Sequence, residues 1–358
     1  MCNLNVLILS PSLNVEDNIS GISSVTRMLI ECNGQVHYVP FIVGKRDSQK
    51  RNLKWIISLL IIPFRFLFVL LKYRLDIIHF NVGFEPLSLY RDFFLFLIAK
   101  FFSIPILLHI HGGRFVLARA KCIFLNGIIR FMVRYSSKVI VLSSLEKYNL
   151  MNNYQLEVEN KIVVLPNAAH LTSELDFVNK NYTDMMSILF LGRLDLNKGL
   201  KEILQVLGKL QDDHIDFKFV VCGDGPKRDW FLRECTSLIG DKLTYEGVVS
   251  GIHKSEILFR SHIFLLPSYF EGLPMSLLET MYAYIVPIVS PVGAIPEVVS
   301  SGLNGFLVSD VSEIVSVIMD LNENRDLLKW ISYKSASCIC DKFSVKTYIN
   351  KLNSLYHV

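Results

Sequence analysis

Residues 263–279 read IFLLPSYFEGLPMSLLE, and this stretch decides the fold. The short apolar run Ile263–Leu266 predicts a strand buried on both faces, as in a parallel sheet that is covered by helices. The turn residues Gly272 and Pro274 follow it and indicate the start of a helix. If the intervening stretch is helical, the two glutamates at positions 271 and 279 lie about 12 Å apart along its axis. A strand, a turn and a helix in this order predict a ligand site in an α/β domain.

Glu271 and Glu279 stand in a mostly apolar segment, where an unpaired carboxylate is costly to bury. Two carboxylates at this spacing suit a nucleotide sugar, because one can accept hydrogen bonds from the sugar and the other from the ribose. The free amides of Gly272, Leu273 and Met275 at the helix start are then available to the pyrophosphate or the sugar. The alternative, two glutamates on a solvated helix face, fits the apolar surroundings poorly.

Apolar runs of this kind alternate with longer, helix-like stretches along the whole chain, which predicts parallel strands connected by helices. The runs are Val6–Leu9, Val36–Ile42, Ile77–Phe80, Ile106–Ile110, Val139–Leu142, Ile162–Leu165, Ser187–Leu191, Phe217–Cys222, Ile263–Leu266, Ile285–Ser290 and Gly305–Val308. The polar stretch 170–184 separates two series of runs. We therefore expect two doubly wound, Rossmann-like domains that face each other across a cleft, residues 1–170 and 171–342. An amphipathic closing helix follows at 343–358.

Two glycine loops follow earlier strands of the second half. The sequence GRLDLNKG at 192–199 places Arg193 and Lys198 at a strand-to-helix transition, where α/β sheets bind ligands. A guanidinium can grip a diphosphate with two parallel hydrogen bonds, and a lysine adds a compact charge. A solvated turn with two incidental cations is the alternative. The second loop, GDGP, opens with Gly223 one strand–helix unit later.

The charge is distributed unevenly. Residues 1–170 carry 19 Lys and Arg against 10 Asp and Glu, whereas residues 171–358 carry 18 against 23. A basic half predicts an anionic partner, either nucleic acid or a membrane leaflet. The aromatic and basic residues do not interleave as in platforms that bind single strands, so we expect no nucleic acid.

Residues 55–71, WIISLLIIPFRFLFVLL, are apolar almost all round and follow a basic segment. Three interpretations remain open: a helix at an anionic membrane surface, a buried core helix, or a membrane span. Pro63 and Arg65 near the middle disfavour the span, and the lack of a polar face disfavours the core helix. The surface helix is the interpretation that we prefer, and residues 93–102 could share that surface.

In these motifs the chain resembles the family 4 retaining glycosyltransferases of the glycosyl transferases group 1. GRLDLNKG, GDGP, the two spaced glutamates and GAIPEVVSSGLNGFLV occur in the family's order, and the resemblance extends over nearly all of residues 187–308. The resemblance implies the GT-B fold. It also implies that Arg193 and Lys198 bind the donor diphosphate, that Glu271 holds the transferred sugar and that Glu279 binds the ribose.

The first half resembles the family in fewer positions. Gly21 stands where the family has a Gly-Gly loop over the donor phosphates, although Ser20 replaces the first glycine. His111, directly after a predicted strand and before two glycines, matches the family's histidine of the catalytic loop. A histidine at a strand end can also be structural, and we assign His109, on the strand itself, to structure.

The resemblance implies a hexosyltransferase (EC 2.4) that takes sugar from a UDP- or GDP-sugar with retention of configuration and needs no cofactor. No Asp-x-Asp motif occurs, and two cations with a helix terminus can stabilise the leaving diphosphate, so we expect no metal. The basic, apolar first half suggests a lipid-linked saccharide acceptor, in bacterial lipopolysaccharide or capsule assembly at the inner face of the plasma membrane. Seven scattered cysteines suit a reducing cytosol. A sugar-nucleotide epimerase and a non-catalytic binding relative are the alternatives.

Overall fold

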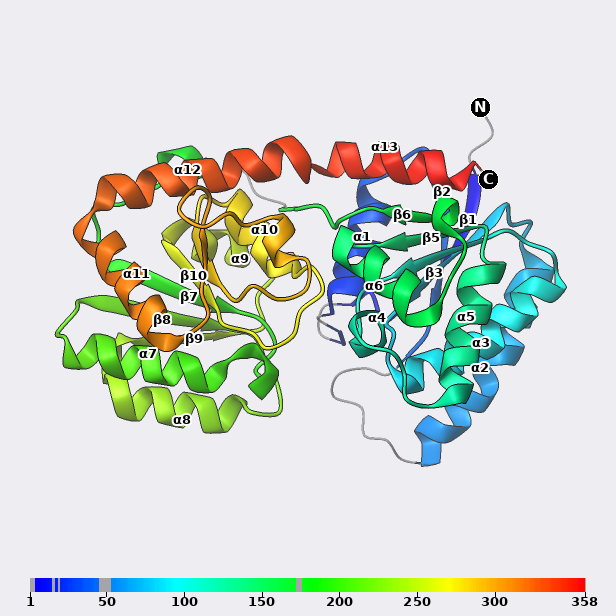
Figure 1. The fold of residues 1–358 in the computed structure, drawn as a ribbon, viewed down its shortest axis with the longest axis horizontal. Coiled ribbons are helices and arrows are strands. Elements are labelled where there is room, and N and C mark those ends of the chain that lie inside the picture. Colours follow the sequence, from blue (N-terminus) through cyan, green and yellow to red (C-terminus); the bar gives the residue numbers. More distant parts are fainter. Residues whose placement is uncertain (1–3, 15–16, 19, 45–52, 172–175, 358) are drawn as a thin grey trace. The chain divides into compact units, whose positions relative to one another are not determined.

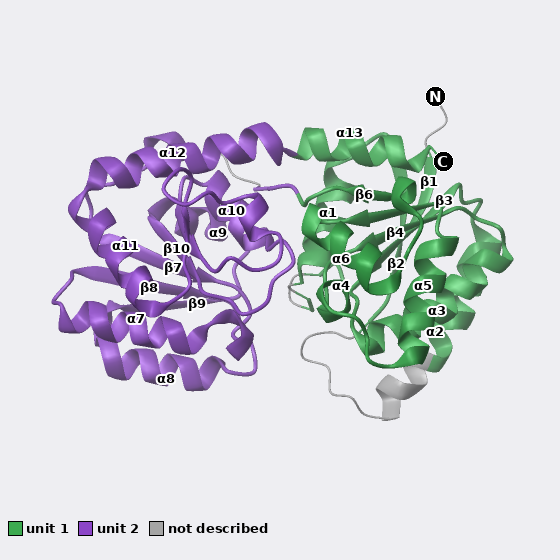
Figure 2. Cartoon of the chain, in the orientation of Figure 1, with its two compact units in different colours: residues 1–167, 345–358 green, residues 168–344 purple. Residues whose placement is uncertain are grey.

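A computed structural model describes residues 4–14, 17–18, 20–44, 53–171 and 176–357, and of residues 53–59 only the backbone. The chain forms two compact units, Met1–Asn167 with Val345–Val358, and Ala168–Ser344 (Figure 2). Each unit is built on one six-stranded sheet in which the strands pair in parallel, with helices between successive strands (Figure 1). The α/β architecture predicted from alternating apolar runs is therefore confirmed.

The sheet of the first unit has the order β2-β1-β3-β4-β5-β6. Its strands are β1 (Leu4–Ser10), β2 (Val36–Ile42), β3 (Ile77–Val82), β4 (Ile106–Ile110), β5 (Lys138–Val141) and β6 (Ile162–Val164). Its helices are α1 (Gly21–Cys32), α2 (Leu53–Lys72), α3 (Pro86–Phe101), α4 (Arg114–Leu117), α5 (Ile123–Tyr135), α6 (Ser144–Tyr154), the 3-10 turn η1 (Glu159–Lys161) and α13 (Val345–Tyr356).

The sheet of the second unit has the order β12-β11-β10-β7-β8-β9. Its strands are β7 (Met186–Leu191), β8 (Phe217–Cys222), β9 (Leu243–Gly247), β10 (Ile263–Leu266), β11 (Val286–Val289) and β12 (Phe306–Leu307). Its helices are α7 (Leu200–Asp212), α8 (Arg228–Ile239), α9 (Gly251–Arg260), α10 (Met275–Tyr282), α11 (Val311–Glu323) and α12 (Arg325–Lys342), with 3-10 turns η2 (Phe177–Asn179), η3 (Leu196–Lys198), η4 (Gly240–Lys242) and η5 (Ile295–Glu297).

Every apolar run predicted as a strand overlaps a strand of the structure. Strand β9 was not predicted, because its sequence LTYEG is partly polar and lacks the continuous apolar run of a buried strand. It lies at the edge of the sheet and pairs only with β8, so its residues need not be apolar on both faces.

The stretch 170–184 is not simply a polar linker, and the prediction is wrong at two positions. Lys180 is buried, and its ammonium donates to the carbonyl oxygens of Leu258, Ser261 and Ala283 at 2.9, 2.8 and 2.7 Å. Burial lowers the pKa of Lys180 well below its ordinary value. Tyr182 is also buried and donates to a carbonyl oxygen of the same unit. These contacts attach the start of the unit to the ends of α9 and α10, where helix carbonyls lack partners of their own.

Helix α13 follows α12 in the chain but belongs to the first unit. Tyr356 bonds to His79 of β3 at 2.8 Å and lies 3.3 Å from the hydroxyl of Tyr38. Asn353 accepts a hydrogen bond of 2.7 Å from Asn33. The predicted amphipathic helix at 343–358 is thus present from Val345, and its inner face closes the first unit.

Helix α2 contains the segment predicted at 55–71. Its residues Ile62, Phe66 and Leu70 are buried at the spacing of one helix face, whereas Phe64 and Phe68 are 73% and 63% exposed. The helix therefore contributes to the core on one side and presents apolar side chains on the other. No helix in the described part of the chain is long and apolar enough to cross a membrane.

Candidate active site

The predicted donor residues of the second unit gather where the strand order of its sheet reverses. Strands β7 and β10 pair directly although two strands separate them in sequence. The loops after the carboxyl ends of these strands carry Lys198 and Glu271. Open α/β sheets bind ligands at such a switch point, because neighbouring loops diverge there and leave a crevice.

Lys198 and Glu271 form an ion pair between these two loops. The ammonium donates to both carboxylate oxygens of Glu271, at 2.6 and 2.8 Å. Ser268 donates a further hydrogen bond of 2.7 Å to the same carboxylate. The Glu271 side chain is 6% exposed and that of Lys198 25%, so the pair is largely shielded from water but open on the lysine side. The structure thus brings together two residues that the sequence predicted separately.

Two glycines allow these loops to approach so closely. A Cβ atom on Gly199, which has φ +73°, would lie 2.0 Å from the carbonyl oxygen of Pro267. A Cβ atom on Gly293, which has φ +59°, would lie 2.1 Å from the carbonyl oxygen of Glu271. Both positions need a residue without a side chain, because of the contact and because of the positive φ. The backbone around Glu271 is therefore held from both sides by loops of neighbouring strands.

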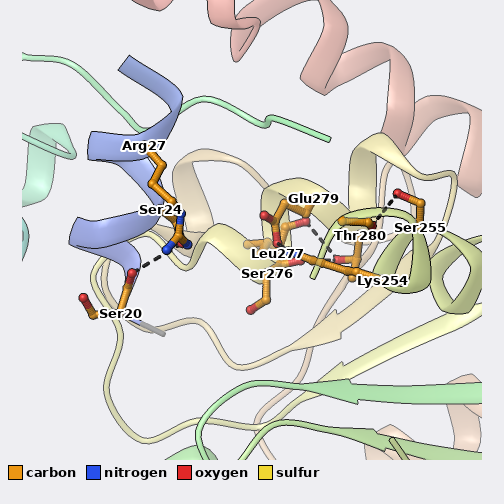
Figure 3. A network of polar contacts seen from close by, with 10 residues as sticks. Ser20, Ser24, Arg27, Lys254, Ser255, Ser276, Leu277, Glu279 and Thr280 are labelled. Carbon is orange, nitrogen blue, oxygen red and sulfur yellow. Dashed lines mark hydrogen bonds and ion pairs between the residues drawn. The ribbon is translucent and has the colours of Figure 1, made fainter. Parts of the chain in front are cut away.

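Glu279 on α10 has a partner that the sequence analysis missed. Lys254 of α9 donates to its carboxylate at 2.6 Å (Figure 3), and the two side chains are 18% and 9% exposed. The lysine lies 25 positions earlier in the chain, on a helix without a recognisable motif, so only the packing of α9 against α10 identifies it. Lys254 thus fixes the position of the Glu279 side chain, whose oxygens can accept further hydrogen bonds.

The helix after Glu271 begins later than predicted. Residues Gly272 and Leu273 precede it, Pro274 is its N-cap, and Met275 is its first residue. The assumption that all of the stretch between the two glutamates is helical is therefore wrong, because the chain must first cross from the strand end past the loop of Gly293. No side-chain cap bonds the first turn of α10, so its amides still face outward from a positive helix end.

Arg193 and Gly223 lie in the neighbouring loops. Arg193 follows β7 and is exposed. Gly223 follows β8 directly and is tied to β9, since its amide donates to the Gly247 carbonyl at 2.6 Å and its carbonyl accepts from Tyr245 at 3.0 Å. The two loops are joined by backbone bonds between Gly192 and Cys222 and between Leu194 and Asp224. Arg193, Lys198 and Gly223 thus share one end of the sheet.

The first unit contains the other two predicted site residues. Gly21 is the first residue of α1, and Ser20 is the N-cap, whose side chain accepts a hydrogen bond from the amide of Ser23. A helix N-terminus after β1 is a position that suits a phosphate. Ser20 therefore has a role of its own at the place where the family has a further glycine.

His111 follows directly after β4 and is half-buried. Its Nε2 atom lies 2.8 Å from the amide oxygen of Asn81, the last but one residue of β3. Burial lowers the pKa of His111 to about 3, so its imidazole is neutral at physiological pH. His109 and His79, on the strands behind it, are completely buried, and burial lowers their pKa values as well.

In chemical terms the second unit offers two anchored carboxylates, a lysine and an exposed arginine at one end of a sheet. This set can bind hydroxyl groups and an anionic group at the same time. Among the described residues, no group of three or more His, Cys, Asp or Glu side chains is placed to hold a metal ion. Independence of metal stays a prediction.

The sequence of the second unit is similar to that of a known protein family. Residues 172–336 match the family described as glycosyl transferases group 1. The gpi3 subunit of phosphatidylinositol N-acetylglucosaminyltransferase from Schizosaccharomyces pombe is 26% identical over 216 residues. These cover 59% of this chain but 47% of the relative, so the chain spans about half the length of that protein.

Solved structures match nearly the whole chain. Sucrose-phosphate synthase from Thermosynechococcus elongatus superposes with a TM-score of 0.79 at 15% identity, covering 99% of this chain and 98% of that one. Anabaena HepE, in complex with UDP and glucose, gives a TM-score of 0.71 at 15% identity, with 98% of both chains covered. At this identity the likeness concerns the fold, and the predicted GT-B architecture is confirmed.

Proposed function

Because residues 172–336 match the glycosyl transferases group 1 family and the whole chain has the GT-B fold, we propose that the protein is a retaining glycosyltransferase. It moves a sugar from a UDP- or GDP-sugar to a lipid-linked saccharide. The family match supports the prediction of a glycosyltransferase, and the UDP complex of HepE supports the nucleotide sugar as donor. The gpi3 relative carries a lipid acceptor in its name, which supports the lipid-linked class.

The observation that carries the proposal is the anchored carboxylate of Glu271. Lys198 and Ser268 fix it at the end of β10, beside the positive end of α10. A diphosphate can share Lys198 with this carboxylate, and a sugar hydroxyl can donate to Glu271. Charge that develops on the leaving diphosphate then meets fixed positive groups, which is the kind of stabilisation that lowers a barrier most.

A panel of UDP- and GDP-sugars tests the donor in two steps. Thermal shift with each donor identifies the nucleotide, because a ligand that binds only the folded protein raises its stability. Turnover with and without a saccharide acceptor then follows, and the anomeric configuration of the product is read by NMR. We expect transfer with retention, and a large loss of kcat in Glu271→Gln. A new sugar nucleotide formed without acceptor would instead identify an epimerase, and inversion would refute retention.

The membrane part of the proposal rests on an apolar surface of the first unit. It is formed by exposed side chains of three neighbouring helices, α2, α3 and α5, which lie side by side in Figure 1. Its members are Leu60, Phe64, Phe68, Leu71, Leu87, Tyr90, Phe94, Phe101, Ile123 and Phe124. The rings of Tyr90 and Phe124 stack with centroids 6.1 Å apart, so α3 and α5 contribute to one continuous patch.

The charge around this apolar surface suits anionic lipid. Between Leu53 and Lys138 the sequence has 12 Lys and Arg but 3 Asp and Glu. Lys72 lies 5.9 Å from the ring centroid of Phe68, so cation and apolar side chain adjoin on the surface. Long basic side chains can reach lipid headgroups while their neighbours enter the apolar boundary. We therefore place the enzyme at the inner face of a bacterial plasma membrane, in surface-polysaccharide assembly.

Vesicle flotation tests this placement. The native protein should float with vesicles that contain phosphatidylglycerol and much less with pure phosphatidylcholine. The double variant Phe64→Glu/Phe68→Glu should lose flotation and keep donor binding. Ile252→Glu is the matched control, because Ile252 is as exposed as Phe64 but lies in the second unit. Equal flotation of both variants would refute the role of this surface.

A further inference from the structure

Four polar side chains lie on one face of the first sheet, inside otherwise apolar strands. His79 and Asn81 alternate along β3, and His109 and His111 alternate along and just beyond β4. The parallel register places Asn81 opposite His109, so the four side chains form two neighbouring rows. His79, Asn81 and His109 are at most 3% exposed. Buried polar groups of this kind are costly unless they are paired, so the arrangement calls for a reason.

The orientation of the Asn81 amide follows from its neighbours. Its nitrogen Nδ2 lies 2.9 Å from the carbonyl oxygen of Leu9, which can only accept. The same nitrogen lies 3.3 Å from the hydroxyl oxygen of Thr26, whose own proton is donated to the carbonyl oxygen of Ile22 at 2.8 Å. Both neighbours therefore require a donor at this end of the amide. The oxygen Oδ1 consequently points to His111.

His111 must then donate to Asn81. Its Nε2 atom lies 2.8 Å from Oδ1, which has no proton to give. A neutral imidazole carries one proton, so a proton on Nε2 leaves Nδ1 with a free lone pair. Among the described residues, Nδ1 has no hydrogen-bond partner.

We propose that Asn81 is a positioning residue, which holds His111 in the Nε2–H tautomer so that its Nδ1 atom accepts a hydrogen bond from a substrate hydroxyl. The inference rests on the proposed function only for the identity of that substrate, a sugar. A hydrogen-bond acceptor at Nδ1 would orient the hydroxyl proton of a bound sugar toward His111. The opposite tautomer would present an N–H donor there, so the hydroxyl proton would have to point elsewhere.

The residues behind His111 hold its ring in place. The ring of His109 lies against it, tilted by 32°, with centroids 3.9 Å apart. His109 is bonded through Nδ1 to Nε2 of His79 at 3.1 Å, and His79 to the hydroxyl of Tyr356 at 2.8 Å. Within the part of the chain that the structure describes, the Nε2 atom of His109 is buried without a partner. This favours a bare lone pair there and a proton on Nδ1, since an unpaired buried N–H is rarer. The C-terminal helix thereby supports the site through a chain of side chains.

NMR of protein with 15N-labelled histidine reads the tautomer without any turnover. Long-range couplings from the ring protons distinguish the two nitrogens, and His111→Gln assigns the signals. His262 is an internal reference, because the Ser187 amide donates to its Nδ1 at 3.1 Å and its Nε2 faces the Asn181 carbonyl at 2.8 Å. Backbone groups thus define His262 as an Nε2–H tautomer, and we expect His111 to show the same pattern.

Two variants separate the acceptor from the size of the side chain. Asn81→Leu removes the acceptor, so His111 should become a mixture of tautomers, and kcat should fall by roughly 10-fold or more while the KM for the donor changes little. Asn81→Asp in its protonated form donates its O–H to the Leu9 carbonyl, as the amide does, and keeps an acceptor for Nε2–H, so it should keep the native tautomer. Unchanged backbone amide signals of the first unit, which contains Asn81, check that each variant is folded, because His262 reports only on the second unit.

Three results would overturn the proposal: a proton on Nδ1 in the native protein, an unchanged His111 spectrum in Asn81→Leu, or loss of the native tautomer in Asn81→Asp. Because the spectrum needs no substrate, it decides about Asn81 even if no nucleotide sugar is turned over. A native enzyme inactive with every donor would refute the proposed function and leave the tautomer result intact.

Discussion

The ion pair between Lys198 and Glu271 allows a quantitative prediction about the candidate donor site. Replacement of Lys198 by Met removes both hydrogen bonds of 2.6 and 2.8 Å and leaves the Glu271 carboxylate with Ser268 as its remaining hydrogen-bond partner among those described. Because Glu271 is 6% exposed, water can replace the lost ammonium only in part. The variant should therefore be destabilised by more than an exposed pair would suggest.

The magnitude follows from distance and burial. Two unit charges about 3 Å apart attract each other by roughly 5 kcal/mol at an effective dielectric constant of about 20. Desolvation of the carboxylate and the partial exposure of Lys198, 25%, reduce the net value. We expect Lys198→Met to cost about 2–3 kcal/mol of unfolding free energy, and the coupling energy of the pair to be about 2 kcal/mol. In the double variant Lys198→Met/Glu271→Gln the buried charge is absent, so most of the lost stability should return.

Urea denaturation of the four proteins of this double-mutant cycle measures the coupling. The three tryptophans are Trp55 in α2, and Trp230 and Trp330 in α8 and α12. In a Trp55→Phe background the fluorescence therefore reports only on the second unit, which contains the pair. Measuring one unit in this way avoids a mixed transition of two compact units.

An equivalent cycle on Arg228 and Asp229 is the control, because this pair is close, 2.8 Å, but exposed. Its coupling should be close to zero, since solvent screens exposed pairs. A coupling at Lys198 and Glu271 that is equally small would refute the reasoning. The carboxylate would then be stabilised by its surroundings rather than by the lysine.

Three further predictions concern the loops, pH and metal. Gly293→Ala should lower the free energy of unfolding, measured by urea denaturation, by more than about 2 kcal/mol and should weaken donor binding, because the new Cβ would lie 2.1 Å from the Glu271 carbonyl oxygen. Gly34→Ala is the control and should be nearly neutral, since its Cβ would have no atom within 4 Å. The first unit should lose stability in acid, because burial lowers the pKa of His79 from 6.5 to about 3. As the pH falls, the unfolded chain therefore binds a proton at His79 before the folded chain does. The folded state is thereby destabilised progressively below pH 6.5. At pH 5 this loss is about 2 kcal/mol for His79 alone, and His79→Phe should flatten the dependence measured through Trp55 in a Trp230→Phe/Trp330→Phe background. Turnover should survive EDTA, and loss of activity that magnesium restores would contradict independence of metal.

The sequence was sufficient to predict the layers of the fold, because continuous apolar runs between helices are typical of parallel strands buried on both faces. Strand β9 was not predicted, because an edge strand can be polar. The start of α10 was predicted too early, because Gly and Pro indicate a turn but not its length. Lys180 was taken for part of a polar linker. Its burial depends on carbonyl groups about 80 to 100 positions away, which no local pattern contains.

In the candidate site, too, the residues with a local sequence pattern could be predicted, whereas those that depend on distant contacts could not. Lys198, Glu271 and His111 could be predicted because each follows a strand, and the ends of parallel strands meet at one edge of a sheet. The side chains that hold Glu271, Glu279 and His111 could not be predicted; they are Ser268, Lys254 and Asn81. A serine in a turn, a lysine on a helix and an asparagine on a strand have no chemical signature until the fold places them opposite a carboxylate or an imidazole.

These partners bear on how the proposed donor would bind. Lys198 and Glu271 neutralise each other in the chain without ligand. When a diphosphate binds Lys198, the Glu271 carboxylate needs another hydrogen-bond donor in place of the ammonium. A hydroxyl of the transferred sugar can supply that hydrogen bond, whereas a nucleoside diphosphate has no sugar at this position and keeps only its ribose hydroxyls, which the resemblance assigns to Glu279. The pair therefore favours the complete sugar nucleotide over the free diphosphate by the energy of the hydrogen bonds to Glu271, about 1.5–3 kcal/mol for a bond to a charged group. In Glu271→Gln the preference for the sugar nucleotide over the diphosphate should become smaller, because Lys198 no longer has to break an ion pair when it binds the diphosphate.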